Sequence, residues 1–552
     1  MEHRISHVLL ACFLLCDVCT AFDRAPRRTE GPVVKVDSGL VEGTHSPDNP
    51  ELVFFRGIPY AAPPVGALRW KPPQLPARWH GTRNADELSA ACPQTDFLYG
   101  VFQRLVSMVG GDRSLVKPVG RTSEDCLYLN VMTTGLHNKN PQPVMVWIHG
   151  GGGVFGRGDD DGATLAPKGV VVVTINYRLG VFGWLSHPAL TAESPHQSSG
   201  NYGLLDQIAA LQWVRRNIAK FGGDPANVTI FGHSSGGEYV GCLMVSPLTR
   251  GLFQRAIMQS GVPLGLHPSV HHPGGEVESA QNHGVEFARK LGAGDDTAEI
   301  KKLRSISADD LLKASADGGF DAVVDGWVLP EQPLVMFAGH EQADVPVIVG
   351  STAREYSNLI GPKERTPEMF RDWVRKSYAP IANDVLHMYV IPTPADAREA
   401  FIRAATELEM SAPARWAAQA MQGMKSNAYL YEVTWAFPSQ GGQQLGAFHG
   451  MDPWLMFDSP PVPRDAAGDA LVEALRDYWT QFARVGDPNM KGLPKWPPYD
   501  AATASCLELG AKIRPAARLH QDAFALLDRL YTTRLSWIRP SLSPPCLAGY
   551  EH

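Results

Sequence analysis

Apolar residues gather in several short runs that do not alternate with polar residues. The clearest are residues 144–148 and 170–175, which read Val-Met-Val-Trp-Ile and Val-Val-Val-Val-Thr-Ile. Runs of this kind are typical of strands that are covered on both faces, as in a mostly parallel sheet. Further strands are predicted over residues 33–36, 52–58, 227–231, 253–258, 345–349 and 428–434.

Helical spacing follows several of these runs. In residues 203–221, Leu205, Leu211, Val214 and Ile218 recur with the period of an α-helix. Other helices are predicted over residues 238–245, 276–291, 297–314, 366–424 and 466–483. Alternating strands and helices predict an α/β fold with a large, mostly parallel central sheet flanked by helices. The helical insertions, at about 263–339 and 360–424, are expected to form the walls of a pocket over the strand ends.

Composition narrows the class of protein. The chain has 552 residues, of which 44% are hydrophobic and 19% charged, and these values are typical of a globular protein. A net charge of −7 disfavours nucleic acid as a partner, because phosphate binding needs a basic surface. No linker divides the chain, so residues 22–552 are predicted to form a single domain. The sequence does not indicate an oligomeric state.

The N-terminus predicts export. Arg4 precedes the apolar run 8–16, and Ala21 suits a cleavage site, so residues 1–21 are predicted to be a signal peptide. The protein is then expected to be secreted or periplasmic. The apolar run is too short to cross a bilayer, and no later stretch is long enough. A lipoprotein site at Cys12 is the alternative, and it would leave an unusually short signal.

Export would leave five cysteines: Cys92, Cys126, Cys242, Cys506 and Cys546. Because five is odd, at least one should stay a thiol or pair between chains. Cys242, at an apolar position of a predicted helix, is expected to be a buried free thiol. Cys92 and Cys126 bracket a loop whose closure would stabilise the fold by about 3–4 kcal/mol. A bond between Cys506 and Cys546 is the remaining pairing.

Residues 232–236 read Gly-His-Ser-Ser-Gly and fit the pattern G-x-S-x-G. A predicted strand precedes them and a predicted helix follows, which is the setting of a nucleophile elbow, a strained turn that exposes a serine hydroxyl. Side chains at Gly232 or Gly236 would clash with neighbouring backbone in such a turn. Ser234 is therefore the candidate nucleophile.

A serine nucleophile needs a base, and the base needs an acid that orients it. In α/β-hydrolases these groups follow in the order serine, acid, histidine. Glu355 comes just after the strand predicted at 345–349, and His449 lies among small residues after the strand at 428–434. The alternative for Glu355 is a surface carboxylate beside Arg354. His449 is one of 18 histidines, so its position alone is weak evidence.

A glycine-rich segment supplies a second element of the same chemistry. Residues 147–153 read Trp-Ile-His-Gly-Gly-Gly-Gly at the end of a predicted strand. Consecutive glycines let backbone N–H groups turn toward one point. Next to a nucleophile, that point is where negative charge develops on the attacked carbonyl oxygen. A phosphate loop is the alternative, but the lysine and the serine or threonine of its pattern are missing.

Two clusters suggest metal binding without the spacing it needs. His267, His271 and His272 lie in a loop rich in proline and glycine, with no cysteine or carboxylate at ligand spacing, so a solvated loop is expected. Residues 159–161 are three aspartates that do not match a calcium loop, and an exposed turn is expected there. No metal and no cofactor are predicted.

With these elements in place, the chain resembles the type B carboxylesterase and cholinesterase family of α/β-hydrolases over nearly its whole mature length. The matching segments are residues 55–61, 123–130, 174–180, 259–261, 478–480 and 486–489. The resemblance implies an α/β-hydrolase fold and a serine esterase that hydrolyses small-molecule carboxylic esters.

The resemblance also implies roles for individual residues. The implied catalytic residues are the nucleophile Ser234, the acid Glu355 and the base His449. The implied oxyanion hole consists of the N–H groups of Gly151, Gly152 and Ser235. Cys92–Cys126 corresponds to the family's first disulfide, and Ser260 to a serine that supports the buried acid.

The chain departs from the family pattern at three places. His233 and Ser235 stand where the family usually has glutamate and alanine, and Tyr356 stands where a glycine is common. Ser235 keeps its backbone N–H, whereas His233 has no predicted role. The loop between Cys92 and Cys126 lacks the tryptophan with which cholinesterases bind a quaternary ammonium. A general carboxylic ester is therefore expected rather than a choline ester.

The expected reaction has two steps. His449 takes the proton of Ser234, an acyl-enzyme forms on Ser234, and water activated by His449 releases the acid. Activity is expected to fall below about pH 6, since the ordinary pKa of histidine is ~6.5. The alternatives are an amidase or acyltransferase with the same triad, and a non-catalytic binding protein of this family. The sequence does not identify the ester.

Overall fold

The computed structural model of the chain describes residues 31–270, 279–294, 296–361 and 365–539. The predicted signal peptide, with Cys12, lies outside these residues. Two histidines considered as metal ligands, His271 and His272, also lie outside them. The same holds for Cys546, the possible disulfide partner of Cys506.

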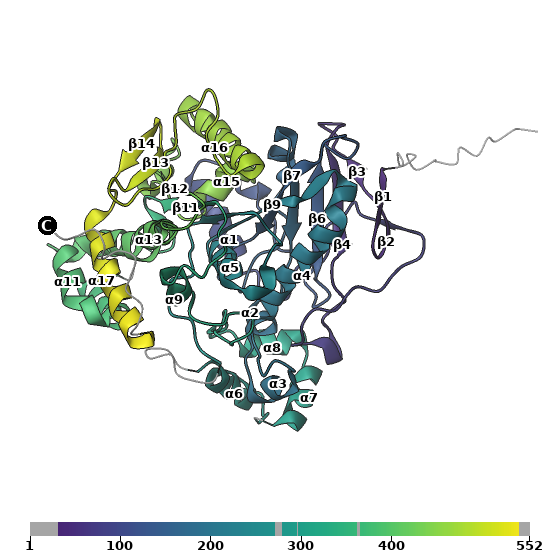
Figure 1. The fold of residues 1–552 in the computed structure, drawn as a ribbon. Helices are drawn as coiled ribbons and strands as arrows, with labels where there is room; N and C mark the ends of the chain where they lie inside the picture. Colours follow the sequence, from purple (N-terminus) through teal and green to yellow (C-terminus); the bar gives the residue numbers. More distant parts are fainter. Residues whose placement is uncertain (1–30, 271–278, 295, 362–364, 540–552) are drawn as a thin grey trace, which may run out of the picture.

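A mixed sheet runs through the centre of the molecule (Figure 1). Within the described residues its eleven strands follow the order β14 (Ile513–Ala517), β13 (Ser505–Leu509), β12 (Ala428–Val433), β11 (Val347–Thr352), β10 (Arg255–Gln259), β9 (Gly223–His233), β7 (Gln142–Ile148), β8 (Val171–Ile175), β6 (Tyr128–Thr133), β4 (Val53–Pro59) and β3 (Thr44–His45). Every neighbouring pair from β13 to β8 is parallel, and the pairs at both edges are antiparallel. The predicted mostly parallel sheet is confirmed. A small second sheet contains β1 (Val33–Val36), β2 (Gly39–Glu42) and β5 (Thr82–Asn84).

Both faces of the central sheet are covered, as the unbroken apolar runs predicted. Along β7, Val144, Val146 and Ile148 join one hydrophobic core, while Met145 and Trp147 join the other. Side chains of successive strand residues point to opposite faces, so an apolar run serves two cores at once.

Helices on each face supply the other half of these cores. One core includes side chains of α4 (Tyr202–Asn217) and α5 (Ser235–Val245). The other includes those of α15 (Met451–Phe457) and α16 (Ala466–Val485), at the top of Figure 1. The helices predicted at 203–221, 238–245 and 466–483 are therefore present, and α5 begins directly after Ser234.

Two long helical connections join neighbouring strands of the sheet. The one between β10 and β11 contains α6 (Ala280–Lys290), α7 (Thr297–Ser305), α8 (Ala308–Ala314) and α9 (Pro333–Ala338). The one between β11 and β12 contains α10 (Pro367–Ser377), α11 (Ala382–Met388), α12 (Ala397–Ala405), the π-helix η10 (Thr406–Ser411) and α13 (Ala412–Ala420). The prediction of one helical stretch over 297–314 is wrong in one respect. The stretch divides before α8, where the Ser307 hydroxyl accepts the N–H of Asp310 at 3.1 Å and caps a new helix.

Several elements were not predicted. Strand β6 contains the buried polar Asn130, whose amide donates to Gly158 O and accepts from Gly57 N, and this residue interrupts the apolar pattern. Strand β14 is an edge strand whose sequence, Ile-Arg-Pro-Ala-Ala, has no apolar run. The helices missed were α1 (Phe97–Met108), α2 (Gly180–Trp184), α3 (Pro188–Glu193), α9, α14 (Gln440–Leu445), α15 and α17 (Gln521–Ile538).

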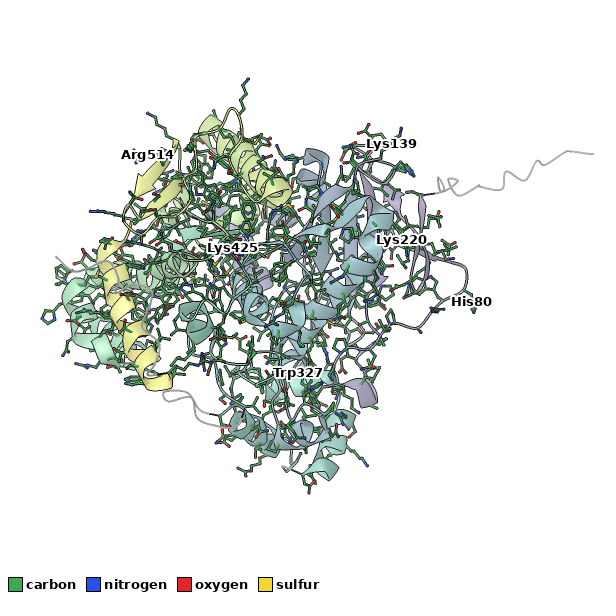
Figure 2. All side chains as sticks on the ribbon, viewed as in Figure 1. His80, Lys139, Lys220, Trp327, Lys425 and Arg514 are labelled. Atoms are coloured by element: carbon green, nitrogen blue, oxygen red, sulfur yellow. A yellow bond between two sulfur atoms is a disulfide. The ribbon has the colours of Figure 1, made fainter. Side chains whose placement is uncertain are left out.

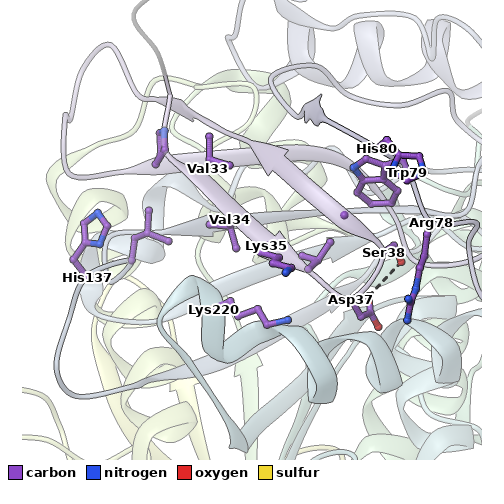
Figure 3. A pocket seen from close by; sticks show the side chains of 14 residues that line it. Val33, Val34, Lys35, Asp37, Ser38, Arg78, Trp79, His80, His137 and Lys220 are labelled. Atoms are coloured by element: carbon purple, nitrogen blue, oxygen red, sulfur yellow. Dashed lines mark hydrogen bonds between the residues drawn. The ribbon is translucent and has the colours of Figure 1, made fainter.

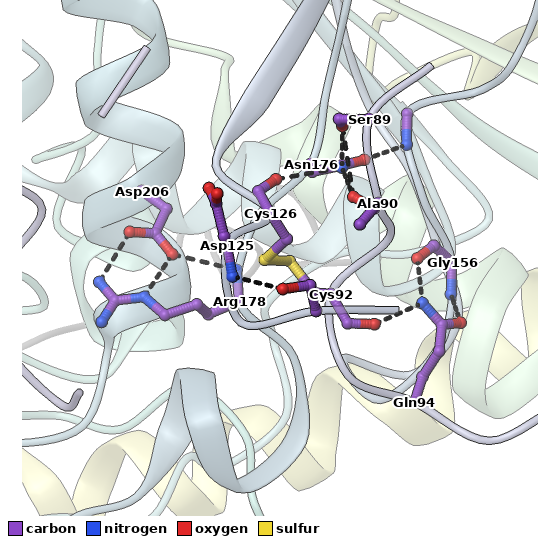
Figure 4. Close-up of a disulfide and its surroundings, with 12 residues drawn as sticks. Ser89, Ala90, Cys92, Gln94, Asp125, Cys126, Gly156, Asn176, Arg178 and Asp206 are labelled. Atoms are coloured by element: carbon purple, nitrogen blue, oxygen red, sulfur yellow. Dashed lines mark hydrogen bonds and ion pairs between the residues drawn. A yellow bond between two sulfur atoms is a disulfide. The ribbon is translucent and has the colours of Figure 1, made fainter. Parts of the chain in front are cut away.

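The disulfide Cys92–Cys126 is present, with a Cα–Cα distance of 5.0 Å, so this predicted pairing is confirmed (Figure 4). Beside it, Gln94 donates to Gly156 O at 2.7 Å and accepts from Gly156 N at 2.9 Å. The disulfide loop is thereby tied to the glycine-rich segment after β7. Cys242 is a buried free thiol, as predicted, and Cys506 also lies buried as a thiol in β13.

Removing the disulfide by Cys92→Ser together with Cys126→Ser is expected to lower the free energy of unfolding. The bond closes a loop of sequence separation 34. Closing such a loop restricts the unfolded chain and contributes about 3–4 kcal/mol. Urea denaturation followed by fluorescence measures the difference. A reductant should shift the wild-type transition and leave that of the double variant in place; equal shifts would contradict the prediction.

Candidate active site

Ser234 occupies the turn between β9 and α5. Its backbone has φ +57° and ψ −129°, a conformation that non-glycine residues rarely adopt and that costs roughly 1–3 kcal/mol. The turn is held by the N–H of Ser234, which donates to Gln259 O on β10 at 2.8 Å. A Cβ atom at Gly236 would lie 2.1 Å from Ile148 O, so only glycine fits where the elbow packs on the end of β7. The predicted elbow geometry is present.

Three side chains meet at this turn. The Oγ of Ser234 lies 2.9 Å from Nε2 of His449, and Nδ1 of His449 lies 2.5 Å from Oε2 of Glu355. A carboxylate can only accept, so Nδ1–H donates to Glu355, and Nε2 is left with a lone pair that faces the serine hydroxyl. The structure therefore brings together the three residues that the sequence proposed as a triad.

Glu355 lies at the start of η7 (Glu355–Ser357), just after β11. It is fully buried, and its second oxygen accepts the N–H of Thr352 at 2.6 Å. The neighbouring Arg354 pairs with Glu399 instead. The alternative of a surface carboxylate beside Arg354 is therefore wrong.

Backbone hydrogen bonds join the loops of the acid and the base. The N–H of His449 donates to Glu355 O at 3.2 Å, and the N–H of Arg354 donates to Ala447 O at 2.8 Å. The side-chain amide of Asn358 donates to His449 O at 3.1 Å. These bonds fix the backbone on both sides of the imidazole, so the orientation of His449 does not depend on its bond to Glu355 alone.

Opposing effects act on the pKa of His449. Burial disfavours the charged ring, but the nearby Glu355 carboxylate, its hydrogen bond and the charge of Asp452 outweigh burial. The net result is a pKa raised above the ordinary value of 6.5. A base with a raised pKa holds its proton more firmly once it has taken it from a nucleophile.

The glycine-rich loop follows β7 directly. Gly151 and Gly152 have φ values of +114° and +63°, which glycine adopts without the penalty of a side chain. The loop is anchored at Gly153, whose N–H donates to the Ser235 hydroxyl at 3.2 Å and whose carbonyl accepts from the Trp184 indole at 3.0 Å. Among the described residues, neither Gly151 nor Gly152 donates a backbone hydrogen bond, so both N–H groups remain available to a ligand.

The chain is similar to known proteins over most of its length. The model of the Carboxylesterase family matches residues 30–525. The chain belongs to the carboxylesterase family. It is 32% identical to Fumonisin B1 esterase of Sphingopyxis macrogoltabida, over 87% of each chain. It is 33% identical to Para-nitrobenzyl esterase of Bacillus subtilis (strain 168), over 87% of this chain and 95% of that protein.

A solved structure of a PNB esterase matches with a TM-score of 0.76 and 30% identity, covering 90% of this chain and all of that one. The protein is thus a carboxylic-ester hydrolase with the α/β-hydrolase fold, as the sequence predicted. None of the helices in the described part of this carboxylesterase has both the length and the apolar character needed to span a membrane.

Two residues that depart from the family pattern, His233 and Tyr356, have defined contacts in the structure. The ring of His233 lies 4.5 Å from that of His449, and its Nε2 lies 4.0 Å from Asp452 Oδ1. Burial, and then the charge of His449, keep the pKa of His233 well below its ordinary range, so the ring stays neutral. Tyr356 donates its hydroxyl to Glu409 on η10 and so ties the loop of the acid to the π-helix.

Sequence analysis missed Asp452, which lies buried behind His449 on α15. Its Oδ2 accepts from the Tyr431 hydroxyl at 2.5 Å and from the Gln259 amide at 2.9 Å. Burial raises the pKa of this carboxyl to about 6 in spite of these two bonds. In the sequence, Asp452 is visible only as an acid three residues after His449. Its role depends on Tyr431 and Gln259, which lie on strands far away in the sequence.

One predicted contact is not formed. Ser260 is buried at the end of β10, where its N–H donates to Gly350 O at 2.8 Å. Its hydroxyl has no hydrogen-bond partner within the described part of the chain, and Glu355 is held by the Thr352 N–H instead. A role for Ser260 in supporting the acid is therefore not seen.

The clusters considered for metal binding have other partners. Asp160 accepts the Trp147 indole N–H at 2.5 Å, and burial raises its pKa to about 7, so it does not lie in the exposed turn expected from the sequence. His267 is buried rather than solvated. Over the residues that the structure describes, no group of three or more histidine, cysteine or acidic side chains is placed to hold a metal ion.

A groove beside β1 has a different lining from this site. It is lined by β1 and by basic side chains that include Lys35, Arg78, His80 and Lys220 (Figure 3). Figure 2 places His80 and Lys220 at the right-hand side of the molecule. No member of the triad lines this groove, so we do not assign the catalytic chemistry to it.

Replacing Ser235 by alanine tests whether its hydroxyl positions the glycine-rich loop. The change leaves the buried N–H of Gly153 without its acceptor, which costs roughly 1–3 kcal/mol. We expect kcat for a 4-nitrophenyl ester to fall about tenfold while KM changes little, and Ser235→Thr, which keeps the hydroxyl, to recover part of kcat. Equal kcat in wild type and Ser235→Ala would contradict this role.

Proposed function

We propose that this carboxylesterase hydrolyses esters through an acyl-enzyme on Ser234, with His449 as the base and Glu355 as the acid that orients it. The observation that carries the proposal is the unbroken line of hydrogen bonds from Glu355 through His449 to Ser234. The line ends on a strained turn that exposes a hydroxyl, which is the arrangement of a serine nucleophile.

The first half of the reaction follows from the direction of these bonds. Nε2 of His449 takes the hydroxyl proton as Ser234 Oγ attacks the carbonyl carbon, and the new imidazolium is stabilised by Glu355. Negative charge then develops on the carbonyl oxygen. The N–H groups of Gly151, Gly152 and Ser235 are the donors we assign to it, each worth about 2.7–4 kcal/mol in the transition state.

The second half repeats these steps with water. His449 returns its proton to the departing alcohol, then takes a proton from water as that water attacks the acyl-enzyme. Release of the carboxylic acid restores Ser234. An amidase or acyltransferase would use the same groups, and the esterase activity named for the relatives favours hydrolysis of an ester. The intact triad disfavours a non-catalytic binding protein.

We also propose that the enzyme acts outside the cytoplasm as one domain from residue 22. The support is the signal-like sequence of residues 1–21 together with the disulfide Cys92–Cys126. Disulfides persist in oxidising compartments and are rare in the cytosol, so the two features favour the same location.

Labelling with a fluorophosphonate tests the nucleophile. Wild type should be labelled at Ser234 and should hydrolyse 4-nitrophenyl butyrate, whereas Ser234→Ala should lose labelling and roughly 10⁴-fold or more of kcat. Ser536→Ala, on the surface helix α17, serves as the control and should retain both. Labelling that survives Ser234→Ala would exclude this serine as nucleophile.

The pH profile tests the base. His449 must be neutral to accept a proton, so kcat/KM falls as the pH drops through its pKa, which the structure raises above 6.5. The acid limb should therefore lie above pH 6.5, higher than the ordinary pKa of histidine alone would place it. Asp452→Asn removes one of the carboxylates that raise this pKa and should move the limb to lower pH. A wild-type limb well below 6.5 would exclude His449 as the base.

A further inference from the structure

The first turn of α5 carries a second functional group beside the nucleophile. From Ser235 to Val245 every residue is buried except Glu238, whose side chain is 28% exposed, and Ser234 before them is also partly exposed. Ser234 is the N-cap of this helix, and its carbonyl accepts the N–H of Glu238 at 3.0 Å. Ser234 and Glu238 therefore lie one helical turn apart.

The carboxylate of Glu238 meets a buried histidine. Nε2 of His267 lies 3.6 Å from Glu238 Oε1 and has no hydrogen-bond partner in the described chain, although His267 is only 5% exposed. Nδ1 of the same ring lies 3.3 Å from Ala322 O, a carbonyl that can only accept. Burial lowers the pKa of His267, so the ring is neutral, Nδ1–H donates to Ala322, and Nε2 presents a lone pair toward Glu238.

The third acceptor is Asp321, on the loop before α9. Asp321 accepts the Tyr239 hydroxyl at 2.9 Å and the N–H of Ala322 at 2.7 Å, both through Oδ1. The Tyr239 hydroxyl in turn packs against Gly153, where a Cβ atom would lie 2.3 Å from it. Tyr239 thus links Asp321 to the glycine-rich loop that we assign to the oxyanion.

Within the part of the chain that the structure describes, no permanently charged side chain pairs with these acceptors. In the described residues, no lysine or arginine forms an ion pair with Glu238 or Asp321. Burial, and then the charge of Asp321, raise the pKa of Glu238 and so favour its neutral form when no cation is bound. Asp321 accepts two donors through Oδ1, but Nε2 of His267 has none in the described residues, so the cluster is suited to a cation that carries N–H groups.

We propose that Glu238, His267 and Asp321 form a recognition site for a primary or secondary ammonium group of the ester substrate. The proposal rests on the proposed esterase function, because Glu238 lies one helical turn after Ser234. An ammonium donates N–H bonds to carboxylate and imidazole acceptors, whereas a quaternary ammonium has no N–H to give. The site therefore selects esters of amino acids or of amino alcohols over their neutral and quaternary analogues.

The test compares matched esters in each variant. One series has the charge in the acyl part: 4-nitrophenyl 6-aminohexanoate, the neutral heptanoate, and the 6-trimethylammonio analogue. A second series of acetates has the charge in the alcohol part: 6-aminohexanol, heptan-1-ol, and the trimethylammonio alcohol, followed by acid release. Wild type should prefer the ammonium ester over the neutral one about tenfold or more in kcat/KM in at least one series, the value of one charge-assisted hydrogen bond.

Glu238→Gln and Asp321→Asn should each bring this preference close to one. Taking the ratio within a single variant cancels any effect on the hydrolytic groups. Asp309→Asn, which removes an exposed carboxylate on α8, is the control for net charge and should keep the wild-type ratio.

The site is excluded if wild type hydrolyses the neutral esters and prefers the ammonium ester in neither series, or if both cluster variants keep the wild-type ratio. If no ester is hydrolysed, the proposed function fails, and calorimetric titration with hexylamine decides the site by itself. Tighter binding to wild type than to Glu238→Gln supports the site, and equal binding excludes it.

Discussion

The close approach of α5 to the end of β7 is the contact on which the rest of the site depends. A Cβ atom at Gly236 would lie 2.1 Å from Ile148 O and 2.6 Å from His149 O, so the first turn of α5 rests directly on the backbone that leads into the glycine-rich loop. This contact sets the sharp turn at Ser234 and also brings the N–H of Ser235 beside the same loop. The proposed nucleophile and the proposed oxyanion donors thus meet at one backbone contact, where a side chain at position 236 would clash.

Burial has the largest effect on the pKa values of the groups around His449, more than the number of acids nearby. Glu355 is held by the Thr352 N–H and by His449. Asp452 lies behind His449, where it bonds to Tyr431 and Gln259. A second carboxylate at position 233, where the family usually has glutamate, would add another negative charge beside Asp452. The neutral His233 ring removes that repulsion, and it leaves the pKa of His449 controlled by Glu355 and Asp452.

The sequence predicted those parts of the site whose signals are local. The elbow at Ser234, the glycine-rich segment and the strand before Glu355 are each read from fewer than about ten consecutive residues. The parts that were missed join segments far apart: Asp452 bonds to Gln259 across 193 residues, and Tyr239 to Asp321 across 82. The hydroxyl of Ser235 was overlooked for the same reason, because its partner Gly153 lies on another loop. The prediction of one helix over 297–314 failed for a local reason. Ser307 lies within the apolar pattern but caps a new helix.

The first turn of α5 carries groups with opposite electrostatic effects. Its N-terminus bears the positive end of the helix dipole, which favours both the Glu238 carboxylate and the negative oxygen that we propose to form near the Ser235 N–H. A negative charge at Glu238 and one on this oxygen would repel each other across a partly buried site. Burial and the charge of Asp321 raise the pKa of Glu238, which favours its neutral form in the empty cluster. An ammonium bound at the cluster would stabilise the carboxylate and offset this repulsion. Recognition of a cationic substrate would then raise kcat as well as lower KM, because the bound charge acts on the oxyanion and not only on the ground state.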